Sequence, residues 1–157
     1  MSSRLLGFIL IIISILAFHL LGSQPETKAL WQRSISDKIY SDPVAAGNRY
    51  IFIGGDKGKR DYKLYEVDDS GKVTAQSVKL PNLPYDPVGY DDIVVIGDYA
   101  RMIRGFSVPG LQIAWESGTV EPFRIPPIKS GDNLIIQSEH NVLFCLDSKT
   151  GQPVWDH

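Results

Sequence analysis

The sequence contains few of the residue types that form disulfides and metal sites. A single cysteine, Cys145, excludes a disulfide within the chain. Its neighbours Leu143, Phe144 and Leu146 are apolar, so Cys145 is predicted to be a small buried core residue and not a reactive thiol. The histidines are far apart in the sequence and have no partners at metal-ligand spacing, so no metal site is predicted. They are His19, His140 and His157.

Concentrated positive charge is also scarce. Sixteen Lys and Arg residues against eighteen Asp and Glu residues leave a formal net charge of −2, and the basic residues do not gather as they do in nucleic-acid-binding proteins. Nucleic acid is therefore not an expected partner. No order of Ser, His and Asp indicates nucleophilic catalysis. We predict no catalytic residues and no cofactor.

The N-terminus, in contrast, has a long apolar run. It extends from Leu5 to Leu21, is interrupted by Ser14 and His19, and follows Arg4. As a helix rising about 1.5 Å per residue it would be about 26 Å long, which can span a membrane with slight local thinning. Since the positive charge precedes the run, the N-terminus is predicted to be cytoplasmic and the rest of the chain exported.

This segment is predicted to be a signal anchor, or transmembrane helix, over residues 1–22, followed by a linker over residues 23–29. A cleaved signal peptide is the alternative, but no pair of small residues marks a cleavage site, which favours the uncleaved anchor. Gly7-Phe8 resembles the processing site of type IV pilins, yet Ile12 stands where that family has glutamate. We expect a single-pass protein of the bacterial inner membrane, with its C-terminal part in the periplasm or outside the cell.

A period of about 40 residues runs through the rest of the chain. Trp31, Trp115 and Trp155 are 84 and 40 positions apart, and Ala75 lies 40 positions before Trp115. A proline follows twelve positions after each of the first three members of this series, at Pro43, Pro87 and Pro127. Such a period indicates a repeat fold. The predicted repeats cover about 32–75, 76–115 and 116–155.

Each repeat is predicted to contain four short antiparallel strands. The second strands are apolar on both faces, as burial between two sheets requires; they are Tyr50–Ile53, Ile93–Ile96 and Leu134–Ile136. The third strands are Leu64–Val67, Ile103–Phe106 and Leu143–Leu146, and the fourth are Lys72–Ala75, Gln112–Trp115 and Gln152–Trp155. Four strands in about 40 residues are typical of a β-propeller blade. The predicted fold is all-β, with about three blades over residues 30–157 after one transmembrane helix.

The first repeat is 44 residues long, and its four extra residues are predicted to lie in the hairpin loop Gly55–Asp61. The loop is basic, so Lys57, Lys59 and Arg60 form a candidate interaction loop. A solvent-exposed connection without a binding role is the alternative. The loop is not a phosphate-binding P-loop, because Ile53 replaces the first required glycine and Arg60 the required Ser or Thr.

The end of the third repeat, Leu146–Trp155, resembles the tail of the PQQ-like repeat, which occurs in quinoprotein dehydrogenases and in the outer-membrane assembly lipoprotein BamB. The second repeat keeps Pro87 and Trp115 but has Phe106–Gly110 in place of the Asp-containing turn, and the first has Ala75 in place of tryptophan. The resemblance implies a β-propeller, in which each tryptophan fills the wedge between neighbouring blades.

Propellers include both enzymes and scaffolds. The calcium ligands and catalytic aspartate of a quinoprotein dehydrogenase are not recognisable, and Asp68 and Asp147 are interpreted as turn caps. The leading hypothesis is an exported scaffold that binds protein or envelope partners or self-associates, and that is not an enzyme. The alternative is the N-terminal portion of a PQQ-dependent oxidoreductase whose active site lies beyond this chain. Because closed rings have about four to eight blades, we expect an incomplete ring.

Overall fold

The computed structural model describes residues 29–82, 84–119 and 125–156. The chain divides into two compact units, Met1–Gln32 and Arg33–His157. The predicted anchor at Leu5–Leu21 lies outside the described residues. Within the described ranges, no helix is long and apolar enough to cross a membrane. The strands described below belong to the second unit.

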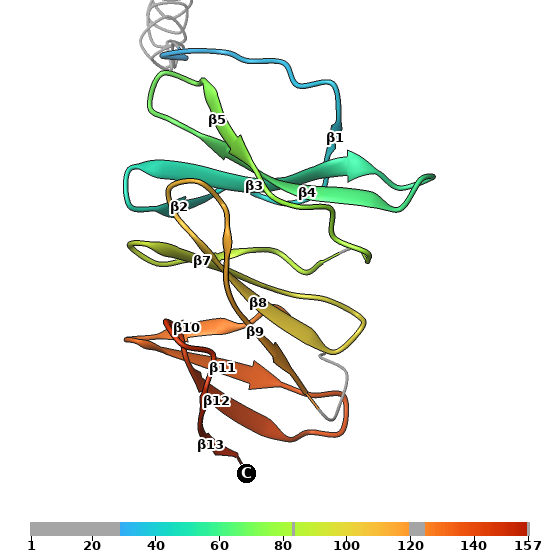
Figure 1. Cartoon of the computed structure of the whole chain (residues 1–157), viewed down its shortest axis with the longest axis vertical. Helices are drawn as coiled ribbons and strands as arrows, with labels where there is room; N and C mark the ends of the chain where they lie inside the picture. The colour runs from blue at the N-terminus through green and yellow to red at the C-terminus, as the bar shows by residue number, and fades with distance from the viewer. Residues whose placement is uncertain (1–28, 83, 120–124, 157) are drawn as a thin grey trace, which may run out of the picture. The chain divides into compact units, whose positions relative to one another are not determined.

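Short strands of the second unit pair into three antiparallel sheets (Figure 1). The first sheet contains β1 (Lys38–Ile39), β2 (Val44–Ala46), β3 (Arg49–Asp56), β4 (Asp61–Val67) and β5 (Val73–Gln76). The second contains β6 (Val88–Gly89), β7 (Ile93–Gly97), β8 (Met102–Ser107) and β9 (Ile113–Gly118). The third contains β10 (Ile128–Ser130), β11 (Asn133–Gln137), β12 (Leu143–Asp147) and β13 (Pro153–Asp156). The prediction of an all-β fold built from four-stranded antiparallel sheets is confirmed, with β1 added to the first sheet.

The same strand register recurs in all three sheets, so their positions can be matched one to one. Ala75, Trp115 and Trp155 are equivalent positions. Each pairs with the residue just before a β-bulge in the neighbouring strand, which is β4, β8 or β12. Those partners are Glu66, Gly105 and Cys145. The 40-residue period of the sequence therefore corresponds to one sheet.

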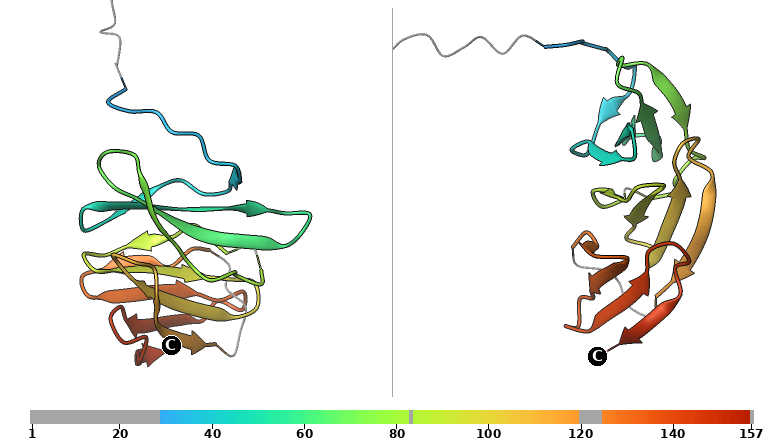
Figure 2. Two further views of the ribbon diagram at one scale, coloured as in Figure 1. Left: turned by 45° about the horizontal axis from the view of Figure 1, so that its top comes forward. Right: turned by 90° about the vertical axis from the view of Figure 1, so that its left-hand side faces the viewer.

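Apolar side chains fill the space between neighbouring sheets, whose stacking order follows the sequence (Figure 2). One cluster joins the first and second sheets, with Ile51, Ile53 and Leu64 on one side and Val94, Ile96 and Phe106 on the other. A second cluster joins the second and third sheets through Val95, Ile103, Trp115, Leu134, Ile136 and Leu146. Because the second sheet is covered on both faces, β7 is buried at every position. That burial accounts for its unbroken apolar run.

The β3–β4 hairpin of the first sheet differs from the prediction in length and in form. Ile53 pairs with Leu64, eleven positions later, whereas Gly97 pairs with Ile103, six positions later. The hairpin thus has five extra residues, and the following turn has one fewer than in the second sheet. Three of the seven residues of the predicted loop, Gly55, Asp56 and Asp61, are paired strand residues, since β3 and β4 continue to the pair Asp56 and Asp61. The four extra residues counted from the sequence therefore equal the five added in the hairpin less the one missing from the turn.

Candidate protein-binding surface

The indole ring of Trp115 lies between its own sheet and the last turn of the third sheet. A Cβ atom on Gly105 would lie 2.4 Å from the ring, and one on Gly151 would lie 2.3 Å from it. The indole Nε1 donates a hydrogen bond to the carbonyl oxygen of Ser148, 3.0 Å away. The side chain is 9% exposed. Two glycines therefore make room for a ring that joins one sheet to the next.

The boundary between the first and second sheets has the reverse arrangement. Ala75 replaces the tryptophan, and it packs against a cluster that contains Leu111. Leu111 is equivalent to Gly71 and Gly151, because the N–H of each donates at 2.9 Å to the first carbonyl of its turn. Their φ angles are 52°, 78° and 68° respectively, in the left-handed region that favours glycine. Leu111 is nonetheless 1% exposed, so its side chain fills space that a tryptophan fills at the next boundary.

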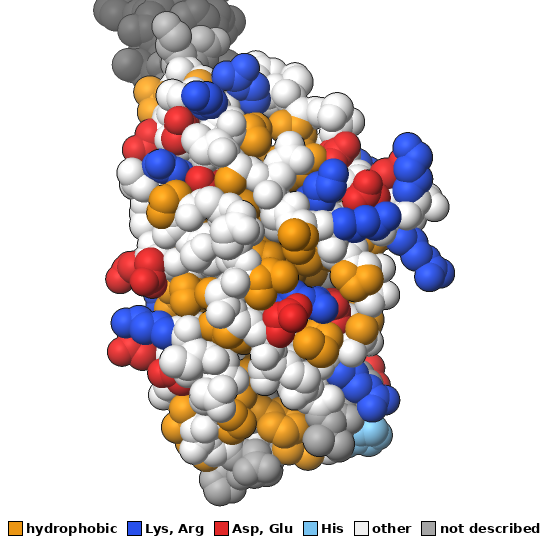
Figure 3. All heavy atoms as spheres, viewed as in Figure 1, with side chains coloured by type: hydrophobic (Ala, Val, Ile, Leu, Met, Phe, Trp, Pro, Cys, Tyr) orange, Lys and Arg blue, Asp and Glu red, His pale blue; other side chains and the backbone are white. Residues whose placement is uncertain are grey.

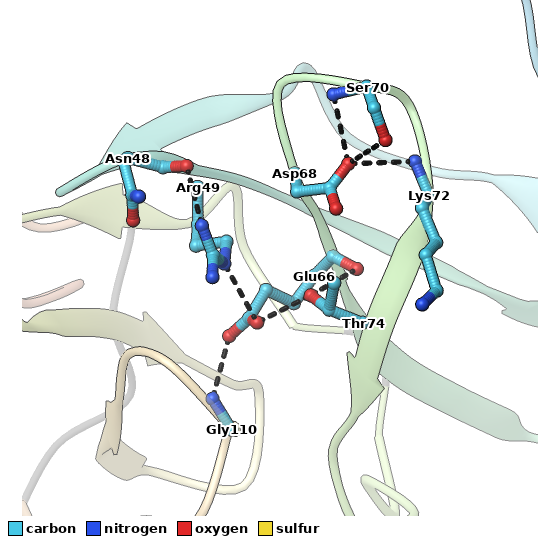
Figure 4. A network of polar contacts seen from close by, with 8 residues as sticks. All are labelled: Asn48, Arg49, Glu66, Asp68, Ser70, Lys72, Thr74 and Gly110. Carbon is cyan, nitrogen blue, oxygen red and sulfur yellow. Dashed lines mark hydrogen bonds and ion pairs between the residues drawn. The ribbon is translucent and has the colours of Figure 1, made fainter.

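A buried carboxylate also joins the first two sheets (Figure 4). Glu66, which is 1% exposed, accepts hydrogen bonds from the backbone N–H of Gly110 at 2.8 Å and from Thr74 Oγ1 at 2.6 Å. Arg49 Nε lies 3.4 Å from the same carboxylate. Both carboxylate oxygens thus have polar partners, as burial of a charge requires. This network is a structural connection between sheets.

The turn carboxylates predicted as caps make local hydrogen bonds. Asp68 accepts from the Ser70 hydroxyl and from nearby backbone N–H groups, and Asp147 accepts in the same way from Thr150. These bonds stabilise the charged form and lower the pKa of both carboxyl groups. Their contribution to the folded turns is therefore present above the ordinary aspartate pKa and is lost as the pH falls through the lowered values.

The apolar side chains of the third sheet that point away from the second sheet are partly exposed to solvent. We call the surface that they form the outer face and define it by Ile128, Ile135, Leu143 and Trp155. The equivalent residues of the second sheet are Val88, Val95, Ile103 and Trp115, which pack in the second cluster. Ile103 is fully buried whereas Leu143 is 41% exposed, and Trp155 is 38% exposed. Hydrophobic side chains reach the surface over the third sheet at the lower end of Figure 3.

Neighbouring apolar side chains that are exposed together are typical of surfaces that bind other molecules. Ile128 is 56% exposed, while its counterpart Val88 is partly buried against the second cluster. Equivalent apolar side chains are therefore buried by the next sheet in the second sheet and exposed in the third. This makes the outer face the strongest candidate binding surface among the described residues.

The predicted interaction loop forms the exposed tip of the β3–β4 hairpin, where basic side chains gather at the right of Figure 3. Asp56 accepts from the N–H groups of Gly58 and Lys59 and lies 3.2 Å from Lys59 Nζ. The Lys59 ammonium lowers the pKa of Asp56. Arg60 has a left-handed φ of 49°. Lys57, Lys59 and Arg60 therefore share one tight loop, and Asp56 offsets part of its charge.

The other predicted residues have different environments. Pro87 and Pro127 are buried, whereas Pro43, just before β2, is exposed. Trp31, in the first unit, is 42% exposed. Cys145 is buried, and burial raises the pKa of its thiol. Within the described ranges, no group of three or more His, Cys, Asp or Glu side chains could hold a metal ion.

Sequence reasoning missed two residues that join the sheets. Leu111 carried a signal, because it occupies the turn position that is glycine in the first and third repeats, and it does so after the repeat that lacks a tryptophan. Glu66 also carried one, as the acidic residue within the otherwise apolar predicted strand Leu64–Val67. Ile135, Leu143 and Trp155 were predicted as strand residues but not as parts of an exposed surface.

No protein-family model and no curated relative matches the sequence. Solved structures do resemble it. BamB from Moraxella catarrhalis has a TM-score of 0.69 and 20% identity over 83% of this chain and 40% of that chain. The computationally designed protein Ika4 has a TM-score of 0.66 and 15% identity over 83% of this chain and 79% of that chain, and the designed protein Ika8 has 0.61 and 16% over 76% and 36%. This chain thus spans less than half the length of the BamB and Ika8 chains. At these identities the likeness concerns the fold, and the described sheets of this chain have a β-propeller-like fold.

Proposed function

We propose that this chain is a scaffold that binds other proteins through the outer face of its third sheet, and that it is not an enzyme. The observation that carries the proposal is the exposure of Ile128, Leu143 and Trp155 at positions whose counterparts in the second sheet are covered. The likeness to BamB supports the propeller-like fold on which the proposal rests.

The outer face offers enough apolar surface to contribute substantially to binding. Complete burial of one fully exposed large apolar side chain stabilises a complex by about 1.5–3 kcal/mol. The four outer-face residues are already partly buried, so each would contribute part of that value. Association itself costs about 4–15 kcal/mol in lost translational and rotational freedom. A partner that covers the whole outer face would therefore offset much of that cost.

The binding role can be tested by photo-crosslinking from the outer face. A photoreactive amino acid at position 143 of the full chain, in the organism that makes it, is expected to give discrete protein adducts identifiable by mass spectrometry. Ile128→Glu in the same chain should reduce the adducts by about tenfold, because a charge in the contact must be desolvated.

Position 78 supplies the matched control. Val78 is also exposed and apolar but follows β5 in the first sheet, so the same photoreactive residue there should give none of these adducts. Equal adducts from positions 78 and 143, or adducts at 143 that persist undiminished with Ile128→Glu, would contradict a binding role for the outer face.

The proposal includes a membrane location. It rests on the apolar run Leu5–Leu21 after Arg4, which is long enough to stay in the membrane and whose charge favours a cytoplasmic N-terminus. In a bacterial host, the full chain is expected to remain with the membranes after alkaline carbonate extraction. Its C-terminal part should be digested by protease added to spheroplasts. Release by carbonate, or protection of the sheets in intact spheroplasts, would contradict this location.

A further inference from the structure

The extension of the β3–β4 hairpin presents a basic loop to solvent. The hairpin is five residues longer than the corresponding hairpin of the second sheet, and its tip extends past the ends of the other two sheets (Figure 1). We call residues 57–60 the basic loop. Three of these four residues are cationic, and all three are exposed: Lys57, Lys59 and Arg60.

Hydrogen bonds of the backbone hold the basic loop in one conformation. Asp56 Oδ1 accepts from two N–H groups of the loop, and the Arg60 N–H donates to the carbonyl oxygen of Lys57 at 3.3 Å. The Lys57 N–H donates to the Tyr40 hydroxyl at 3.1 Å. Within the described part of the chain, Lys59 is the only one of the three cations with an acidic partner, Asp56. That ion pair is exposed and therefore weak.

The strand that leads into the first sheet adds positive charge beside the basic loop. Lys38 of β1 pairs with Gly55, close to the loop, and is exposed. The neighbouring carboxylates are less accessible, because Asp37 accepts a hydrogen bond from Tyr65 and Asp61 is half-buried. The exposed charge at this end of the first sheet is therefore mainly positive, although the whole chain has a net charge of −2.

The pairing of β1 also places the basic loop beside the point where the chain enters the sheet. Lys38 follows the end of the apolar run at Leu21 by 17 positions, which reach about 60 Å at most when extended. In the proposed membrane location, on which this inference rests, that tether keeps the loop near the bilayer surface and raises the effective concentration of a weak contact. We infer that the basic loop binds the anionic phospholipid head groups of the membrane that holds the chain.

The form and charge of the basic loop suit a lipid surface. Three cations in four consecutive positions of an exposed tip can contact several head groups at once, whereas a small free ligand is bound in a concave site. Each basic residue close to an anionic bilayer strengthens the contact by about fivefold. The contact needs no pocket, because the charge of the surface is spread over many lipids.

The inference can be tested with the full chain in vesicles. A fluorophore is attached at Gly58→Cys in chains with Cys145→Ala, and the vesicles contain a trace of lipid whose head group carries a quencher. Vesicles of phosphatidylcholine alone are compared with vesicles that also contain phosphatidylglycerol. We expect quenching to rise several-fold with phosphatidylglycerol. It should fall back at about 1 M salt, where the screening length is about 3 Å.

Three sets of substitutions separate the basic loop from general charge. The neutral-loop variant is Lys57→Gln, Lys59→Gln and Arg60→Asn, since asparagine tolerates the left-handed φ of 49°. The matched control removes three exposed lysines elsewhere: Lys72→Gln, Lys129→Gln and Lys149→Gln. The charge-preserving variant is Lys57→Arg, Lys59→Arg and Arg60→Lys. The neutral-loop variant should lose the quenching that depends on phosphatidylglycerol, whereas the control and the charge-preserving variant should keep it.

Equal quenching on both kinds of vesicle, or equal losses in the neutral-loop variant and the control, would overturn the inference. So would an absence of quenching together with protein crosslinks from position 58, which would assign the loop to a protein partner. Flotation with phosphatidylcholine vesicles tests the anchor separately. A chain that floats with them but shows no quenching on phosphatidylglycerol refutes the lipid contact and leaves the membrane location standing. A chain that floats only with phosphatidylglycerol, and only with the basic loop intact, refutes the location and leaves the lipid contact standing.

Discussion

Trp115→Ala is expected to lower the free energy of unfolding by about 3–5 kcal/mol. The substitution removes a ring packed between Gly105 and Gly151 and the hydrogen bond from Nε1 to Ser148. Because a glycine lies on each side, no neighbouring side chain can fill the space, and a cavity remains. Urea unfolding followed by circular dichroism measures the change.

Trp155→Ala is the matched control for this prediction. It removes the same side chain at the equivalent position of the third sheet, where the ring is 38% exposed and no following sheet covers it among the described residues. We expect a loss of about 1 kcal/mol or less. Equal losses for the two tryptophans would show that coverage by the next sheet contributes little.

Gly151→Leu is expected to cost about 3 kcal/mol in the otherwise unchanged chain, since the new side chain overlaps the Trp115 ring and the φ of 68° disfavours a Cβ atom. Combined with Trp115→Ala, the same substitution should cost far less, because the pair then reproduces Ala75 and Leu111 at the first boundary. The coupling between the two sites should be about 1–3 kcal/mol in favour of the double variant.

The double-mutant cycle requires the four chains to be compared by urea unfolding under one set of conditions. Gly131→Leu is a useful control, because its φ of 61° is similar but no atom lies within 4 Å of its built Cβ. It should show the cost of the backbone conformation alone and no coupling to Trp115→Ala. Strict additivity at position 151 would refute the reciprocal fit between the fourth strand and the next turn.

The sheets could be predicted from the sequence because their signals are local. Runs such as Ile93–Ile96 are apolar at every position, and turn residues such as Gly131 and Asp132 separate them. These features repeat with the tryptophan and proline spacing, so one repeat could be checked against the next. Strand bounds within the first hairpin were less accurate, because a longer hairpin and a shorter turn partly cancel in a count along the sequence.

The candidate surface could not be predicted in the same way. Leu143 and Ile103 have equivalent places in similar apolar strands, yet one is exposed and the other buried. The difference arises because a following sheet covers Ile103, and coverage is a property of the stack and not of the strand. Glu66 shows the same dependence, since its burial is stabilised by the Gly110 N–H, a donor 44 positions away in the chain.

The sequence by itself determined the all-β class, the four-stranded unit and the 40-residue period, because strand and turn formation depend on residues close together in the chain. The tertiary structure decided which tryptophan is covered, how Ala75 and Leu111 fit together and where the apolar outer face lies. These depend on packing between side chains about 40 positions apart, whose volumes must match across a boundary.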